Sequence, residues 1–199
     1  MKESWEDDRD PLAALRGGDP GLFEAFVRTE LKTFLGFFLR LGASRPEAED
    51  LVQDLALKLF QHARNYQAQG RFAPYAFRVA RNLMIDSRRR RAVRPPASAG
   101  GGSADDEENS WLDNVPDRRG QEPEAELARR EEAQRVRAAL DELSERHRLV
   151  FELGVVQELP YQEIGSILEI PVGTVKSRMF HAVRKLQEVL GAVTKEGEA

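Results

Sequence analysis

Apolar residues recur along both halves of the chain at steps of three, four and seven, which is the period of an α-helix. In the first half, residues 22–41 follow this spacing until Gly42 interrupts it. A second apolar stripe covers residues 48–59, and residues 44–47 before it have the Ser-x-x-Glu spacing of a capping box. A third helix is predicted from about residue 73 to residue 91. Since no segment alternates with a period of two, the pattern predicts an all-α protein.

The second half of the chain has the pattern of a helix-turn-helix. A charged, alanine-rich helix is predicted over residues 127–143, and three more helical segments follow it. The last two, residues 161–168 and 174–190, are joined by a five-residue turn. This is the layout of a DNA-binding motif, although an ordinary helical hairpin with a polar outer face has the same pattern. The side chains of the last helix that are expected to face inward are Val175, Met179, Ala182, Val183, Leu186 and Leu190.

Charge changes this picture, because it is distributed in opposed blocks. Residues 71–94 hold eight Arg and one Asp, a net charge of +7. Residues 95–126 hold nine acidic residues and two Arg, a net charge of -7, together with several Pro and Gly. Such a segment cannot bury enough apolar surface to offset its ordering entropy. We therefore predict two small helical domains joined by an acidic flexible linker. The formal net charge of -4 conceals this arrangement.

Several classes of protein are excluded by what the sequence lacks. There is no Cys, which excludes disulfides and thiolate metal sites. The nucleotide-binding, zinc-protease and serine-hydrolase motifs are also missing, so we expect no cofactor, no metal, no small-molecule substrate and no enzymatic activity. The charged N-terminus does not resemble a signal peptide. The most apolar stretch, residues 34–41, is too short for a membrane span, which needs about 20 residues. A cytoplasmic protein without membrane insertion is expected.

The basic helix of the first half is the first candidate for a functional surface. Its outer face carries Arg78, Arg81, Asn82, Ile85, Arg88 and Arg89 at helical spacing. A solvated basic face is one interpretation, but the helix has no Glu that would balance these charges through i,i+4 pairs. The aromatic residues interleaved with them are Tyr66, Phe72, Tyr75 and Phe77. Basic groups that bind phosphates and rings that stack on bases together favour strand-separated DNA. Core packing is the alternative for each ring, above all for Phe72 and Phe77.

The last helix is the second candidate, because its outer face is polar and basic. Thr, Ser, Lys and Arg near a helix N-terminus can contact base edges and phosphates in the major groove of DNA. We expect His181 to contact phosphate or base, because no second His or Cys lies at a spacing that would hold a metal. The outward-facing residues are Thr174, Lys176, Ser177, Arg178, His181, Arg184 and Lys185.

Four motifs carry a resemblance to a known family. They are Ala-Glu-Asp-Leu-Val-Gln-Asp at 48–54, Ala-Arg-Asn-Leu-Met-Ile-Asp-Ser-Arg-Arg at 80–89, Tyr-Gln-Glu-Ile-Gly at 161–165 and Pro-Val-Gly-Thr-Val-Lys-Ser-Arg at 171–178. In order and spacing they closely resemble bacterial RNA polymerase sigma factors of the extracytoplasmic-function (ECF) group. The resemblance implies a non-catalytic subunit that directs promoter-specific initiation. The implied parts are an N-terminal extension (1–21), a region-two helical bundle (22–93), an acidic linker (94–126), a region-four helix-turn-helix (127–190) and a tail (191–199).

The resemblance also implies partners and their contact residues. It implies binding to the β′ clamp and β flap of core RNA polymerase, to promoter DNA, and to an anti-sigma factor that can hold the protein at the membrane. The residues implied to dock on the β′ clamp are Asp50, Leu51, Gln53 and Asp54. Those implied to bind the minus-ten element, with one base flipped out of the stack, are Asn65, Arg71, Phe72, Tyr75, Arg78, Arg81, Asn82, Asp86, Arg88 and Arg89. Those implied to read the minus-thirty-five element are Thr174, Lys176, Ser177, Arg178, His181 and Arg184.

Two positions of the helix-turn-helix depart from the family pattern. Glu169 stands where Gly is usual, and a left-handed conformation costs a non-Gly residue about 1 kcal/mol, so a slightly different turn is expected. Pro160 stands where a Ser or Thr cap is common and is expected to be the first helical residue instead. Two other functions stay open. One is a polymerase-independent helix-turn-helix regulator, which leaves residues 22–93 unexplained, and the other is a helical interaction module without a role on DNA.

Overall fold

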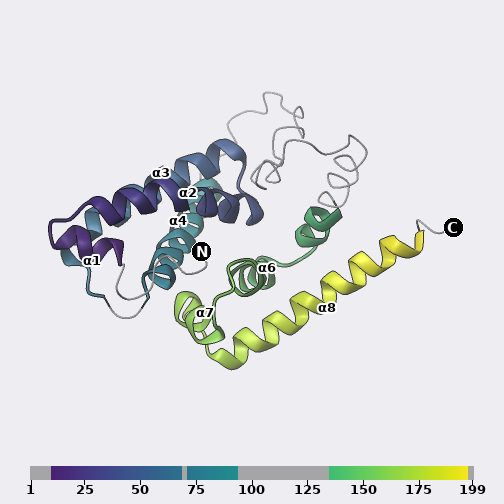
Figure 1. Ribbon diagram of the computed structural model, residues 1–199. Helices are drawn as coiled ribbons and strands as arrows, with labels where there is room; N and C mark the ends of the chain where they lie inside the picture. Colours follow the sequence, from purple (N-terminus) through teal and green to yellow (C-terminus); the bar gives the residue numbers. More distant parts are fainter. Residues whose placement is uncertain (1–9, 69–70, 94–134, 197–199) are drawn as a thin grey trace, which may run out of the picture. The chain divides into compact units, whose positions relative to one another are not determined.

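The computed structural model of this chain describes residues 10–68, 71–93 and 135–196. Within these ranges every regular element is a helix, and the helices form two compact units (Figure 1). The all-α prediction with two helical domains is confirmed. The predicted linker, residues 94–126, lies wholly outside the described residues, and so do residues 127–134 of the helix predicted over 127–143.

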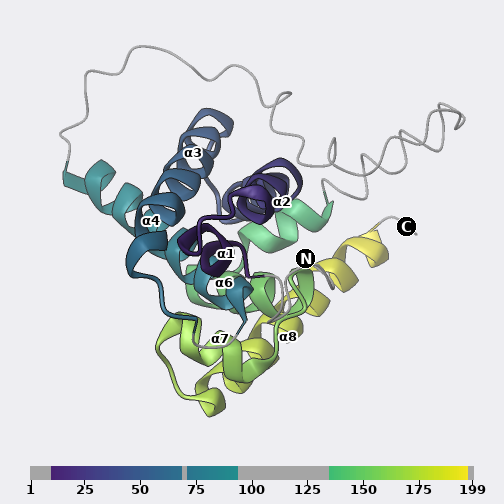
Figure 2. The same cartoon turned by 60° about the vertical axis from the view of Figure 1, so that its left-hand side comes forward.

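The first unit consists of four helices and one short 3₁₀ turn. The helices are α1 (Pro11–Arg16), α2 (Gly21–Arg40), α3 (Arg45–His62) and α4 (Phe72–Val93), and the turn η2 (Ala63–Asn65) follows α3. The helices α3 and α4 pack side by side (Figures 1 and 2). The sequence pattern predicted α2, α3 and α4, and Gly42 ends the first of these stripes with a φ of 88°. It did not predict α1, which lies in the N-terminal extension.

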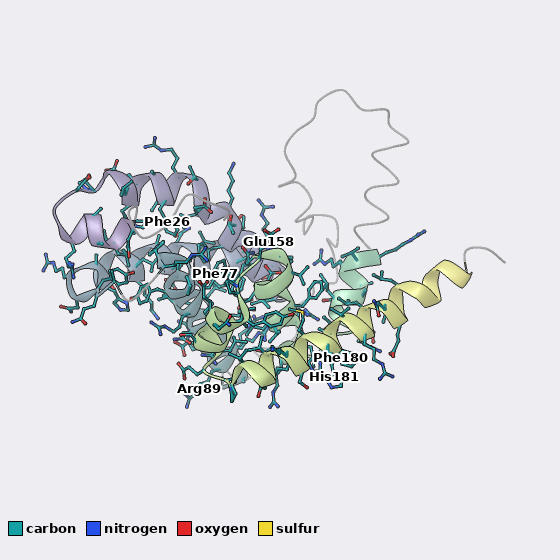
Figure 3. The ribbon with its side chains drawn as sticks, turned by 60° about the horizontal axis from the view of Figure 1, so that its bottom comes forward. Phe26, Phe77, Arg89, Glu158, Phe180 and His181 are labelled. Atoms are coloured by element: carbon teal, nitrogen blue, oxygen red, sulfur yellow. The ribbon has the colours of Figure 1, made fainter. Side chains whose placement is uncertain are left out.

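Phenylalanine rings form the core of the first unit. Phe26, Phe34 and Phe77 are fully buried, and Phe77 lies 4.8 Å from Phe34 and 5.3 Å from Phe37 between ring centroids. The labelled Phe26 and Phe77 lie among the helices of this unit (Figure 3). Smaller apolar residues of α3 and α4 are buried as well, among them Ala48, Leu55, Leu59, Ala76, Ala80 and Leu83. Buried aromatic pairs add about 0.5–1.5 kcal/mol each beyond the area that they remove from water.

The start of α3 is where predicted, but the predicted capping box does not form. Ser44 is the N-cap residue, and Pro46 occupies the first turn, yet the Ser44 side chain makes no capping hydrogen bond. The Glu47 carboxylate is engaged elsewhere, because it accepts a hydrogen bond of 2.6 Å from the Ser87 hydroxyl and pairs with Arg91. Two partners on α4 therefore take the carboxylate that the box would need, and Glu47 joins α3 to α4 instead.

The second unit consists of the helical residues 135–141, followed by α6 (Glu145–Phe151), the π-helical turn η4 (Glu152–Val156), α7 (Tyr161–Leu168) and α8 (Val172–Glu196). Residues 139, 140 and 143 pack on Ala182 and Leu186 of α8. Val175 and Met179 are buried as predicted, whereas Val183 and Leu190 are 36% and 37% exposed, so their predicted inward orientation is wrong. The inner stripe of α8 is narrower than the sequence pattern suggested, because α6 and α7 cover only part of its surface.

The turn between α7 and α8 keeps a left-handed residue although it lacks the usual Gly. Glu169 caps α7 with φ 56° and ψ 43°, which is the left-handed conformation. Because Glu169 adopts this strained conformation itself, the turn does not need the different shape that was expected. Gly165 makes the turn possible, since a Cβ there would lie 3.0 Å from the carbonyl oxygen of Ile170. Pro160 is the N-cap of α7 and not its first helical residue, because its ψ of 147° is extended.

We expect Glu169→Gly to stabilise the second unit by about 1 kcal/mol, because Gly adopts the left-handed conformation without the steric cost of a Cβ. Ser166→Gly is the matched control: residue 166 is exposed on α7 and helical, so Gly there should destabilise by about 0.5–1 kcal/mol. Urea denaturation followed by circular dichroism compares the two variants. A Glu169→Gly variant that loses stability would contradict the strain at this turn.

Candidate nucleic-acid interface

The basic residues of α4 lie on its outer side, around a partly buried tyrosine. Asn82, Asp86 and Arg89 are exposed, whereas Arg78, Arg81 and Arg88 are half-buried. The guanidinium carbon of Arg78 lies 5.5 Å from the ring centroid of Tyr75, a distance at which cation–π attraction acts. Burial raises the pKa of the Tyr75 phenol, and the nearby Arg78 opposes this shift. The face therefore combines fixed positive charge with a neutral aromatic ring.

Phe72 was predicted to bind DNA, and the structure does not support this role. Its ring is 1% exposed and stands edge-on to Phe26, with 5.0 Å between centroids. A ring enclosed in the core has no free face for a base. The alternative that the sequence left open, core packing, is correct for Phe72 and also for Phe77.

The turn before α4 is held by α1, which the sequence did not associate with it. The Tyr66 hydroxyl donates a hydrogen bond of 2.6 Å to Oδ2 of Asp10, and Nη1 of Arg16 donates one of 2.7 Å to the Tyr66 carbonyl. Burial first, and then the hydrogen bond to Asp10, raise the pKa of Tyr66 above its ordinary range. The ring of Tyr66 also lies 4.9 Å from that of Tyr75. Asn65 and Arg71, the exposed residues predicted to meet DNA, flank this anchored tyrosine.

An open groove separates the exposed sides of α3 and α4. Its α3 side is lined by Asp54, Leu57, Lys58 and Gln61, and its α4 side by Leu83, Asp86, Arg89 and Arg90. Of the residues predicted to bind polymerase, Asp50 and Gln53 are exposed and Asp54 is half-buried. Leu51 is 2% exposed, yet it lines a second open groove together with Asp50, Gln53 and Asp54, so its role as a contact stays a prediction. Leu57 and Phe60 are each 55% exposed, and hydrophobic patterning had not marked them as surface residues.

The predicted recognition residues of α8 are accessible. Lys176, Ser177, His181 and Arg184 are exposed, and Thr174 and Arg178 are half-buried. Arg184 pairs with Glu188 one helical turn later, at 2.9 Å. Phe180 is 63% exposed, and the sequence did not single it out. Its ring lies next to that of His181, with 5.6 Å between centroids, and both residues are labelled in Figure 3. A large exposed ring among basic residues can contact the methyl group of thymine in a major groove.

A histidine of α6 lies beside the same surface and was also missed. The rings of His147 and His181 have centroids 5.9 Å apart, although the residues come from different helices. Burial, followed by the neighbouring His181 and Arg178, lowers the pKa of His147 below its ordinary value. No spacing rule could connect these residues, since 34 positions separate them in the sequence.

Within the described residues, no cluster of His, Asp and Glu is arranged to hold a metal ion. The helices of the same ranges include none that is both long and apolar enough to cross a membrane.

Comparison with known proteins matches both units. The family model of sigma-70 region 2 matches residues 26–94, and that of sigma-70 region 4 matches residues 133–186. The "ECF RNA polymerase sigma factor SigL" of Mycobacterium tuberculosis is 34% identical over 180 residues, covering 90% of this chain and 94% of the relative. The "RNA polymerase sigma-H factor" of Pseudomonas aeruginosa is 27% identical, and the match covers 96% of this chain and 97% of the relative.

Solved structures resemble the fold at lower identity. The sigma factor RpoE from Bartonella quintana, solved with the anti-sigma factor NepR, has a TM-score of 0.64 and 23% identity, covering 85% of this chain and 96% of its own. CnrH, solved with the cytosolic domain of CnrY, also has a TM-score of 0.64 and 23% identity, covering 93% of this chain and 99% of its own.

Proposed function

The chain belongs to the ECF group of the sigma-70 family, and from this premise we propose that it binds core RNA polymerase and directs promoter-specific transcription initiation. The observation that carries the proposal is that both family regions occur in order, each as a compact helical unit with an accessible basic face. As a specificity subunit the protein performs no catalysis of its own. It works in the cytoplasm, where the polymerase is, and an anti-sigma factor is its proposed inhibitor.

Each face is assigned one role in this proposal. The outer side of α4, with Tyr75 and the turn before it, binds the minus-ten element and receives the flipped base. The first half of α8 reads the minus-thirty-five element in the major groove. The exposed side of α3, where Leu57 and Phe60 are exposed apolar residues in addition to the predicted Leu51, docks on the polymerase clamp. The residues proposed to contact the minus-ten and minus-thirty-five elements are the ones predicted from the sequence, except Phe72.

Transcription in vitro tests the function as a whole. Core polymerase is incubated with a promoter library, with and without this chain. Initiation at a defined set of promoters only when the chain is present supports the proposal. Sequence-specific DNA binding without core, and without initiation, would support the polymerase-independent regulator instead. If neither initiation nor DNA binding is observed, the remaining candidate is a helical interaction module.

We expect Arg178→Ala to weaken binding to the recognised promoter by about 1–3 kcal/mol, which is the discrimination that one good base contact supplies. Arg28→Ala is the control and should leave promoter binding unchanged, since Arg28 is exposed on α2, a helix that carries none of the residues assigned to DNA. Holoenzyme is titrated onto the promoter and onto a version with a scrambled minus-thirty-five element. An equal loss on both DNAs would identify a phosphate contact and contradict base reading by Arg178.

A further inference from the structure

The two histidines of the second unit form a pair at the edge of the proposed recognition surface. His181 is exposed on α8, in the same helical turns as Ser177 and Arg184, and His147 is half-buried in the first turn of α6. Their ring centroids are 5.9 Å apart and the ring planes are inclined by 36°. The Ser144 hydroxyl lies 3.1 Å from Nδ1 of His147, so that nitrogen already has a partner.

Charged groups of both signs lie near this pair, since Glu145 and Arg146 directly precede His147 on α6. Arg178 of α8 acts on His147 together with His181, and both disfavour its protonation. Two carboxylates that precede α6 in the sequence form ion pairs with other residues. Asp141 pairs with Arg148 at 3.1 Å, and Glu142 pairs with Lys185 at 3.8 Å. Farther along α8, Glu188 pairs with Arg184. Each of these carboxylates is thus paired with a cation other than the two imidazoles.

An anion placed against both rings would favour protonation of His147, which its present surroundings disfavour. A phosphate oxygen accepts a hydrogen bond from a protonated imidazole, and its charge favours the protonated form. In DNA-binding helix-turn-helix units the recognition helix enters the major groove while the first helix of the motif, here α7, crosses the backbone. His147 adds to that arrangement, because α6 packs against α8 and places its imidazole beside His181.

We propose that His147 and His181 together bind one backbone phosphate of the DNA, and that the pair takes up a proton from solvent when it does so. This inference rests on the proposed function, because it requires α8 to lie on DNA. It adds His147 to the DNA-contacting residues and makes binding depend on pH. The contact carries no sequence information, since phosphates are the same at every base pair.

The direction of the pH dependence follows from linkage. The free protein holds the pKa of His147 below its ordinary value, and bound phosphate raises it. DNA affinity therefore increases as the pH falls from above the pKa of the bound state to below that of the free state. The gain is several-fold, with a ceiling of about tenfold per pH unit for each proton taken up. The same low pKa means that the folded unit without DNA loses stability as acid charges His147, which sets the lower limit of the measurement.

The experiment measures the affinity of the full chain for a fluorescent random-sequence duplex, from about pH 8 to about pH 6, at low and constant ionic strength. A random duplex suffices because the proposed ligand is a phosphate. The chain has three histidines, so three variants account for all of them: His147→Gln, His181→Gln and His62→Gln. His62 lies 3.2 Å from the hydroxyl of Tyr75, a DNA-assigned residue of the other unit, so His62→Gln is a control for the pH slope and not for the affinity itself. We expect the pH slope to flatten in the first two variants and to persist in the third.

Several results would overturn the inference. A flat profile in the unmodified chain would do so, as would a slope that survives His147→Gln and His181→Gln or disappears with His62→Gln. Proton NMR titration of the His147 imidazole, with and without duplex, gives an independent check: its pKa must rise on binding. No binding at any pH would instead contradict the DNA-facing surfaces of the proposed function.

Discussion

Leu55→Ala is expected to lower the free energy of unfolding of the first unit by about 2–5 kcal/mol, whereas Leu57→Ala lowers it by about 1 kcal/mol or less. Both leucines lie on α3, but Leu55 is fully buried and Leu57 is 55% exposed. The two substitutions remove the same atoms, so their difference reports burial alone. Denaturation followed by hydrogen exchange of peptides from α2 to α4 measures the effect in this unit without averaging it with the other.

Binding to core polymerase should be weakened by Leu57→Ala and not by Leu55→Ala, which is the reverse of their effects on stability. Leu57 lies in the groove beside Asp54, on the face assigned to the polymerase clamp. Buried apolar anchors at interfaces commonly contribute more than about 1 kcal/mol, so Leu57→Ala should weaken assembly at least fivefold. Leu55→Ala, measured where it is still folded, should assemble like the unmodified chain. If Leu57→Ala assembles normally, the exposed side of α3 is not the docking face.

Most of the helices were predictable because amphipathic spacing and helix termination are local properties. The predicted segment at 161–168 coincides with α7, since the residues around it, Pro160 and Glu169, cannot continue the helix in their observed conformations. The start of α3 was also predicted, at the Ser-Arg-Pro-Glu sequence. The capping box failed for a non-local reason, because Ser87 and Arg91, some 40 positions away, bind the Glu47 carboxylate.

Surface and core could not be separated as well, because exposure depends on which neighbours cover a helix. Leu51 and Leu57 belong to the same helix, yet Leu51 is buried and Leu57 is 55% exposed. Phe72 is buried although it begins a basic helix, whereas Phe180 is exposed although it follows a buried Met179. The same limit concealed the pairing of His147 with His181 and of Asp10 with Tyr66, since each pair joins distant segments.

Asp10→Ala is expected to destabilise the first unit by about 2–5 kcal/mol, because one buried carboxylate makes two kinds of contact. Oδ1 caps α1 by accepting hydrogen bonds from the amides of Leu12 and Ala13, at 2.9 and 3.1 Å. Such a cap contributes about 0.5–2 kcal/mol. Oδ2 accepts the Tyr66 hydroxyl, and a hydrogen bond to a charged group contributes about 1.5–3 kcal/mol. Asp19→Ala is the matched control, since Asp19 accepts from the Gly21 amide but is exposed.

Tyr66→Phe separates the second contact from the first, since it keeps the ring against Tyr75 and removes only the hydroxyl. We expect a loss of about 1.5–3 kcal/mol, and a double variant with Asp10→Ala that loses less than the two single losses together, because both remove the same bond. The turn that Tyr66 anchors carries Asn65, so promoter opening by the holoenzyme should fall while duplex binding by α8 stays unchanged. Permanganate reactivity of unpaired thymines measures that opening. Additive losses of stability, or unchanged opening in Tyr66→Phe, would show that α1 does not hold the turn in its working position.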